Sequence, residues 1–221
     1  MAERAAPALQ APSPPADAPL AGPPLTHLLY LHGFRSSPRS FKAQRLADWV
    51  AAQRPDLVWC CPQLPPDPDA ALALIDALTG DWPAAGMAVI GSSLGGFYAC
   101  VVAEARGCRA LLLNPAVDPA RDLARHIGRL TAWHDPALSF DFGPEHVAAL
   151  RAMAPATLRA PQRYAALIAE GDEVLDAAEM RARHAAAAGL RVIPGSDHAL
   201  SDFDAHLPWL IATLGLAPAG H

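Results

Sequence analysis

The sequence lacks the features that would direct a protein to nucleic acid or into a membrane. Its 221 residues carry a net charge of −5, and the 17 lysines and arginines form no cluster. Nucleic acids and anionic membrane surfaces attract proteins through such clusters, so neither is an expected partner. No stretch provides the roughly 20 consecutive apolar residues that a membrane-spanning helix needs.

Cysteine is also scarce. The chain has four cysteines, and none of them forms a C-x-x-C pair. A disulfide or metal framework is therefore not expected, and reduced, buried thiols are. The first residues contain neither the apolar core of a signal peptide nor a twin-arginine motif, so we expect a cytoplasmic protein.

The domain organisation follows from length and composition. Residues 1–24 are rich in alanine and proline and predict a disordered tail. Residues 25–217 have the length and apolar content of one globular domain. Within it, residues 118–161 have helical periodicity interrupted by prolines. They predict a small helical cap insertion above the carboxyl ends of the strands.

Short apolar runs alternate with segments of helical periodicity. This order is typical of an α/β fold with a mostly parallel sheet, because each parallel connection needs a crossover. The predicted strands cover residues 28–31, 57–61, 87–90, 110–113, 164–169 and 190–193. The predicted helices cover residues 41–54, 69–79, 95–106, 176–188 and 203–214.

Residues 91–95, Gly-Ser-Ser-Leu-Gly, match the G-x-S-x-G pattern of a nucleophile elbow. A predicted strand leads into this turn and a predicted helix leads out, as an elbow requires. The turn would hold Ser93 in a strained conformation with its hydroxyl exposed, and the glycines on either side would prevent clashes. The alternative is a glycine-rich turn that binds a phosphate at the helix N-terminus, although no lysine follows as in a P-loop.

A serine nucleophile needs a base, and His198 follows the last predicted strand, the position of the base in an α/β-hydrolase. Asp172 follows the preceding strand and is the predicted acid. It would accept the second imidazole N–H and stabilise the imidazolium. Glu173 and Asp176 are the competing acids, but Asp176 stands where the next helix needs an N-cap.

The tetrahedral intermediate of acyl transfer needs hydrogen-bond donors, each contributing on the order of a hundredfold to a thousandfold in rate. The backbone N–H of Leu94, at the start of a helix, is the first predicted donor. The second is that of Phe34, in the loop after the first strand. We expect His32 in this loop to be a structural brace.

Several segments together resemble the YqiA-type esterases, small bacterial α/β-hydrolases. The similar segments are residues 29–34, 62–65, 91–96, 114–117 and 171–176, and the likeness spans residues 28–216. The resemblance implies a cytosolic esterase that cleaves acyl esters, with acyl thioesters as a second class, without a cofactor. It implies a triad of Ser93, Asp172 and His198. Arg35 stands where the family usually has an uncharged polar residue.

We therefore predict a reduced α/β-hydrolase fold of about six mostly parallel strands, because the first strand already ends in the oxyanion loop. The predicted reaction is two-step acyl transfer on a small-molecule ester or thioester, with no cofactor or metal. A peptidase or thioesterase could use the same triad. A non-catalytic scaffold whose insertion binds a partner protein is an alternative from another class. A further alternative is a metal site at His198, Asp202 and His206, although no ligand motif supports it.

Overall fold

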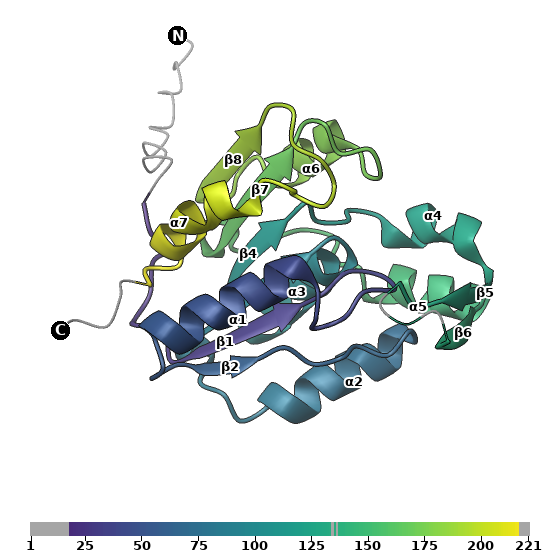
Figure 1. The fold of residues 1–221 in the computed structure, drawn as a ribbon, viewed down its shortest axis with the longest axis horizontal. Helices are drawn as coiled ribbons and strands as arrows, with labels where there is room; N and C mark the ends of the chain where they lie inside the picture. The colour runs from purple at the N-terminus through teal and green to yellow at the C-terminus, as the bar shows by residue number, and fades with distance from the viewer. Residues whose placement is uncertain (1–17, 134, 136, 217–221) are drawn as a thin grey trace, which may run out of the picture.

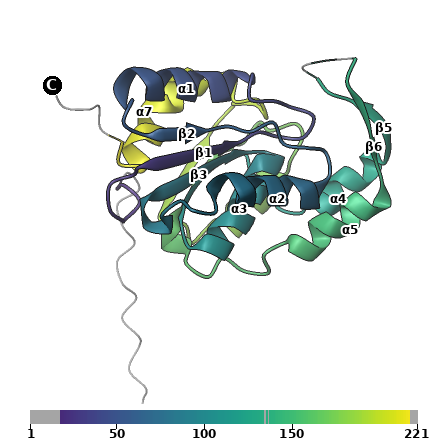
Figure 2. The same ribbon diagram turned by 90° about the horizontal axis from the view of Figure 1, so that it is seen from below.

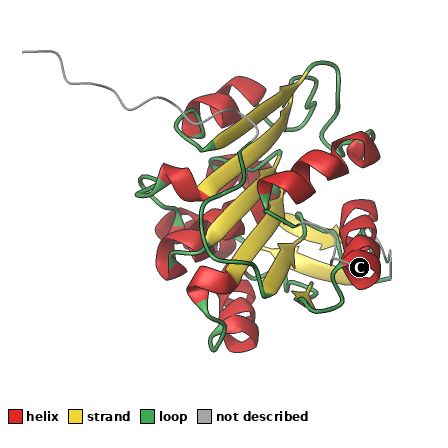
Figure 3. Cartoon of the chain, turned by 90° about the vertical axis from the view of Figure 1, so that its left-hand side faces the viewer, coloured by secondary structure: helices red, strands yellow, loops and turns green. Residues whose placement is uncertain are grey.

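The computed structural model describes residues 18–133, 135 and 137–216. Six parallel strands form one sheet in the order β2-β1-β3-β4-β7-β8 (Figures 1 and 3). They are β1 (His27–Leu31), β2 (Val58–Cys60), β3 (Met87–Ser92), β4 (Arg109–Leu113), β7 (Tyr164–Ala169) and β8 (Gly189–Ile193). These are the six predicted runs, so the predicted sheet is confirmed.

Helices cover both faces of the sheet. In Figure 2, α1 (Phe41–Gln53) and α7 (Phe203–Thr213) lie above it, whereas α2 (Pro68–Thr79) and α3 (Leu94–Arg106) lie below. Successive strand side chains point to opposite faces. In β1, Leu28 and Tyr30 accordingly pack with α1 and α7, and Leu29 and Leu31 pack with α2 and α3. Both faces of the four central strands are buried, which explains why these strands are largely apolar, whereas the edge strands β2 and β8 are partly exposed.

The helix before β8 is shorter than predicted. It was expected over residues 176–188, but α6 is Ala177–Arg183, and turns lead from there to β8. The helix has to end before β8 because β8 runs parallel to β7, and its first residue, Gly189, pairs with Ala165 near the start of β7. None of the helices in the described residues is long and apolar enough to cross a membrane.

The insertion at residues 118–161 is not purely helical, which corrects the prediction. It contains α4 (Pro119–Leu123) and α5 (Pro144–Met153) and, between them, an antiparallel hairpin of β5 (Gly128–Thr131) and β6 (Ser139–Phe142). Phe140 and Phe142 stand two residues apart, on one face of β6, and both contact the ring of Phe34, with centroids 6.1 and 5.2 Å away. Packing against a distant loop therefore favours a strand here.

The described residues also form three short 3₁₀ helices: η1 (Ala84–Gly86), η2 (Ala124–His126) and η3 (Pro161–Arg163). The predicted tail, residues 1–24, lies mostly outside the described residues. Its described end packs on the domain, because Leu20 is 3% exposed and its backbone N–H donates to the Thr213 carbonyl at 2.8 Å. The ordered domain thus begins before residue 25.

Candidate active site

Ser93 lies at the turn between the central strand β3 and helix α3. Its backbone has φ 56° and ψ −121°, a conformation that residues other than glycine rarely adopt. A Cβ atom at Gly91 would overlap the carbonyl oxygen of Gly95, and one at Gly95 would overlap that of Leu31. Only glycine fits at these two positions, so the strained turn depends on both.

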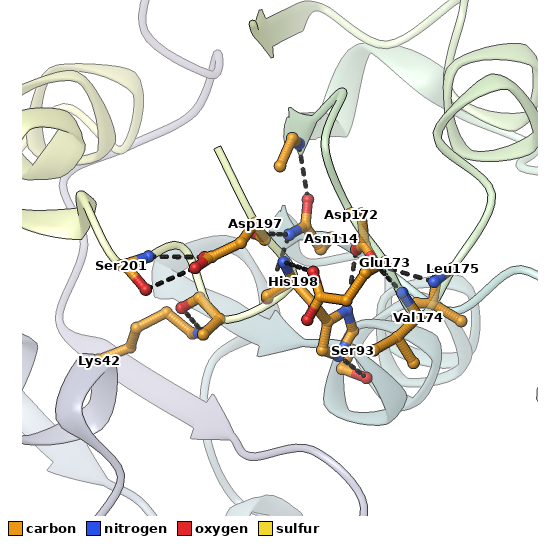
Figure 4. Close-up of polar contacts among 12 residues, drawn as sticks. Lys42, Ser93, Asn114, Asp172, Glu173, Val174, Leu175, Asp197, His198 and Ser201 are labelled. Carbon is orange, nitrogen blue, oxygen red and sulfur yellow. Dashed lines mark hydrogen bonds and ion pairs between the residues drawn. The ribbon is translucent and has the colours of Figure 1, made fainter. Parts of the chain in front are cut away.

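The ends of three strands bring the predicted triad residues together (Figure 4). Ser93 follows β3, Asp172 follows β7 and His198 follows β8. His198 Nε2 lies 3.1 Å from Ser93 Oγ, and His198 Nδ1 lies 2.8 Å from Asp172 Oδ2. The carboxylate accepts a hydrogen bond from Nδ1–H, which leaves the Nε2 lone pair facing the serine hydroxyl.

The three neighbouring acids have different partners. Asp172 has a fully buried side chain, and its Oδ1 accepts the backbone N–H groups two and three residues later, both at 2.8 Å. Its Oδ2 is thereby aimed at His198. Asp176 caps α6 by accepting the N–H groups of Ala178 and Glu179. Glu173 accepts the backbone N–H of His198 at 3.0 Å, whereas the two ring nitrogens of His198 bond to Asp172 and Ser93.

Asn114 is a further site residue, and no role was predicted for it. Its fully buried side chain donates to the carbonyls of Asp197 and His198, at 3.1 and 3.2 Å, and accepts the N–H of Ala169 at 2.8 Å (Figure 4). It therefore ties the histidine loop to the end of β7. A polar residue directly after a buried strand was the available signal, but its partners lie 55 and more positions away.

Lys42 of α1 supports the same loop. Its Nζ donates to the Ala199 carbonyl at 2.5 Å. Burial lowers the pKa of Lys42 to about 8, and the charges of Asp197 and Asp172 oppose this shift. Asp197 in turn accepts the backbone N–H and the hydroxyl of Ser201, at 2.9 and 2.6 Å. Three side chains from other segments, Asn114, Lys42 and Glu173, thus hold the loop that carries His198.

The predicted oxyanion donors lie beside the serine. Phe34 and Leu94 line the same cavity as Ser93 and His198. A Cβ atom at Gly33 would be 3.2 Å from the Ser93 Cβ, so the loop before Phe34 passes directly over the serine. Within the described part of the chain, the backbone N–H groups of Phe34 and Leu94 have no acceptor. They are available to a bound group.

His32 braces this loop, as predicted. Its Nε2 accepts the backbone N–H of Leu64 at 3.0 Å. Because that N–H can only donate, the ring proton resides on Nδ1, which donates to the Gly33 carbonyl at 2.9 Å.

The structure separates the residues of the metal hypothesis. Asp202 accepts the Ser196 hydroxyl at 2.5 Å and bonds to His206 Nε2 at 2.9 Å, whereas the His198 ring contacts Asp172 and Ser93. Over the described ranges, no three histidine, cysteine or acidic side chains form a group that could hold a metal ion.

Ser93 and His198 open onto a cavity of about 490 Å³. Its wall includes residues of the insertion, such as Pro119, Leu123 and His126, so the insertion forms one side of the site. This volume lies in the range of small-molecule pockets.

The parallel sheet, the strained serine turn and the histidine after the last strand define the α/β-hydrolase class of proteins. The chain belongs to the uncharacterised protein family UPF0227, whose model matches residues 27–215. The resemblance to the YqiA-type family is thereby confirmed.

Solved structures share this fold. A proposed hydrolase of the alpha/beta superfamily from Xanthomonas campestris pv. campestris is 22% identical, with a TM-score of 0.55, covering 86% of this chain and 97% of that one. Alpha/beta hydrolase domain-containing protein 10 from mouse is 15% identical, with a TM-score of 0.63 and coverages of 86% and 89%. Est1E from Butyrivibrio proteoclasticus, solved with ferulic acid bound, is 14% identical, with a TM-score of 0.63 and coverages of 90% and 94%. At such identities the likeness shows the fold.

Proposed function

We propose that this protein is a serine hydrolase that cleaves small-molecule acyl esters with a triad of Ser93, His198 and Asp172. The observation that carries the proposal is the continuous hydrogen-bonded chain from Ser93 Oγ through both ring nitrogens of His198 to Asp172. A strained serine at a strand-to-helix turn supports it, because such a turn exposes the hydroxyl to a substrate.

In the first half of the reaction, Ser93 Oγ attacks the ester carbonyl carbon while His198 Nε2 takes the hydroxyl proton. Asp172 stabilises the resulting imidazolium. Negative charge moves to the carbonyl oxygen, where the backbone N–H groups of Phe34 and Leu94 would receive it. The intermediate collapses when the C–O bond to the alcohol breaks and His198 returns its proton to the leaving oxygen.

In the second half, water attacks the acyl-serine and His198 accepts a proton from it. The acid is released and the proton returns to Ser93 Oγ. A thioester would follow the same course with a thiol as the leaving group. We propose that the insertion at residues 118–161 selects among substrates, since its residues form one side of the cavity.

Labelling with a fluorophosphonate probe, followed by a panel of 4-nitrophenyl esters and acyl thioesters of graded chain length, tests the proposal. We expect wild-type protein to be labelled at Ser93 and to hydrolyse at least one short ester. Ser93→Ala should abolish both signals, while the neighbouring Ser92→Ala should retain most activity. A folded wild-type protein that neither reacts with the probe nor hydrolyses any member of the panel would favour the non-catalytic scaffold.

A further inference from the structure

The cavity beside Ser93 is lined by cations although the protein as a whole carries a net charge of −5. Arg35, Lys42 and Arg125 are part of its wall, and Asp122 is the one carboxylate among the residues that line it. Asp122 is paired with Arg121, at 2.8 Å, but Arg121 also binds Glu179, so the charge of Asp122 is only partly compensated. The three cations still outnumber this one carboxylate. The wall therefore presents an excess of positive charge to whatever enters.

These three cations bond to uncharged acceptors. Arg35 Nε donates to the Thr131 carbonyl at 2.6 Å, Arg125 Nε to His126 Nε2 at 3.4 Å, and Lys42 to a backbone carbonyl. In the described part of the chain none of them forms an ion pair, whereas several arginines elsewhere on the surface do. A guanidinium has five N–H donors, so both arginines retain donors for a further acceptor.

Arg35 and Arg125 lie at the same part of the cavity wall, next to His126. Burial lowers the pKa of His126, and the charges of Arg125 and Arg35 lower it further. The geometry agrees, because Arg125 Nε bonds to His126, and the ring centroid of His126 lies 6.2 Å from that of Phe34. Arg35 directly follows Phe34, so this region adjoins the loop above Ser93. Much of the remaining wall is apolar, with Phe34, Leu94, Leu123, Val174 and Leu175.

We propose that the substrate carries a carboxylate or phosphate group in addition to the bond that is cleaved, and that Arg35 and Arg125 bind this group. The inference rests on the proposed function, because it describes the substrate of the same cavity. Guanidinium groups bind such anions through paired, charge-assisted hydrogen bonds, while the apolar wall accommodates the carbon chain between the anion and the ester. Lys42 adds positive charge beside the histidine loop.

Two matched esters test the proposal: 4-nitrophenyl hexanoate, which ends in a methyl group, and mono-4-nitrophenyl adipate, which ends in a carboxylate. A phosphonate-terminated analogue separates phosphate from carboxylate recognition, and 3-carboxy-4-nitrophenyl hexanoate places the anion on the leaving group. Wild-type protein gives kcat/KM for each ester. Calorimetry on Ser93→Ala gives Kd independently of turnover. We expect at least one anionic ester to be favoured about tenfold or more in both constants, which corresponds to one charge-assisted contact.

Measured in the Ser93→Ala background, Arg35→Gln and Arg125→Gln should each reduce severalfold the ratio of Kd for the neutral ester to Kd for the favoured anionic ester. Arg129→Gln is the matched control, because Arg129 is an exposed arginine of β5 that bonds to Ser139 and does not line the cavity. Equal Kd values for neutral and anionic esters would overturn the proposal. An equal loss of the preference in Arg129→Gln, Arg35→Gln and Arg125→Gln would also overturn the proposal. The preference would then come from the net charge of the protein and not from two specific arginines.

The test distinguishes the two proposals. Hydrolysis of both esters with equal constants would contradict the anion site alone. Tighter binding of the anionic ester to Ser93→Ala, without turnover of any ester by the wild type, would support the anion site and contradict the hydrolase.

Discussion

Replacing Asp172 by asparagine should reverse the tautomer of His198. The Oδ1 atom of Asp172 accepts two backbone N–H groups at 2.8 Å, so the asparagine oxygen must occupy that position. The new NH₂ group then faces His198 Nδ1, where the carboxylate oxygen lay 2.8 Å away. Because the NH₂ group donates, Nδ1 must accept and the ring proton moves to Nε2. Nε2 faces Ser93 Oγ and can no longer take its proton.

The expected loss in kcat is on the order of 10⁴-fold, the size of effect that the same change has in a serine-protease triad. It corresponds to about 5 kcal/mol in the activation free energy. Asp176→Asn is the control, because asparagine is an equally good N-cap for α6. Its activity should stay within about twofold of wild type, since a cap change acts on stability and not on the tautomer.

The assay combines steady-state hydrolysis of the best 4-nitrophenyl ester with thermal unfolding of each variant. Asp172→Asn should melt as a folded protein and lack activity. Asp172→Asn with more than about a tenth of wild-type kcat would refute the tautomer argument, because forced inversion costs orders of magnitude. An inactive Asp176→Asn would show that Asp176 is the acid.

Three further predictions concern stability. Asn114→Ala should lower the free energy of unfolding by about 2 to 3 kcal/mol, because it leaves one buried backbone N–H and two partly buried carbonyls without their partner; an unchanged urea midpoint would contradict this. Burial lowers the pKa of His184 to about 4. As pH falls below about 6.5, this histidine therefore takes up a proton in the unfolded chain before it does so in the folded protein. Lowering the pH from 7 to 5 should reduce the free energy of unfolding by about 2 kcal/mol. His184→Gln should show a correspondingly flatter dependence in urea unfolding. Leu20→Ala should cost about 2 to 3 kcal/mol in the same assay, whereas Ala21→Ser, at an exposed position, should cost almost nothing.

The strands and the serine turn could be predicted because their determinants are local. A strand buried on both faces is an apolar run, and each of the six runs became a strand of the sheet. The glycines at 91 and 95 are required by overlaps within or beside the turn itself. Chain order then pointed to Asp172 and His198, because parallel strands bring their carboxyl ends to one edge of the sheet.

The hairpin β5–β6 and the end of α6 were missed because distant contacts outweigh local preference. Phe140 and Phe142 belong to a strand whose packing partner, Phe34, lies about a hundred positions earlier in the chain. The alanines that follow His184 favour helix, but pairing of Gly189 with β7 requires the chain to turn.

By itself, the sequence determined the α/β class, the six strands and the order of Ser93, Asp172 and His198, since periodicity and turn residues act over a few positions. Only the tertiary structure decided which side chains surround them. Asn114 and Lys42 bond to the histidine loop from positions far away in the chain, and Arg35 and Arg125 line one cavity only because the insertion folds over it. Side-chain contacts of this kind depend on the relative placement of whole elements, and no local pattern encodes that placement.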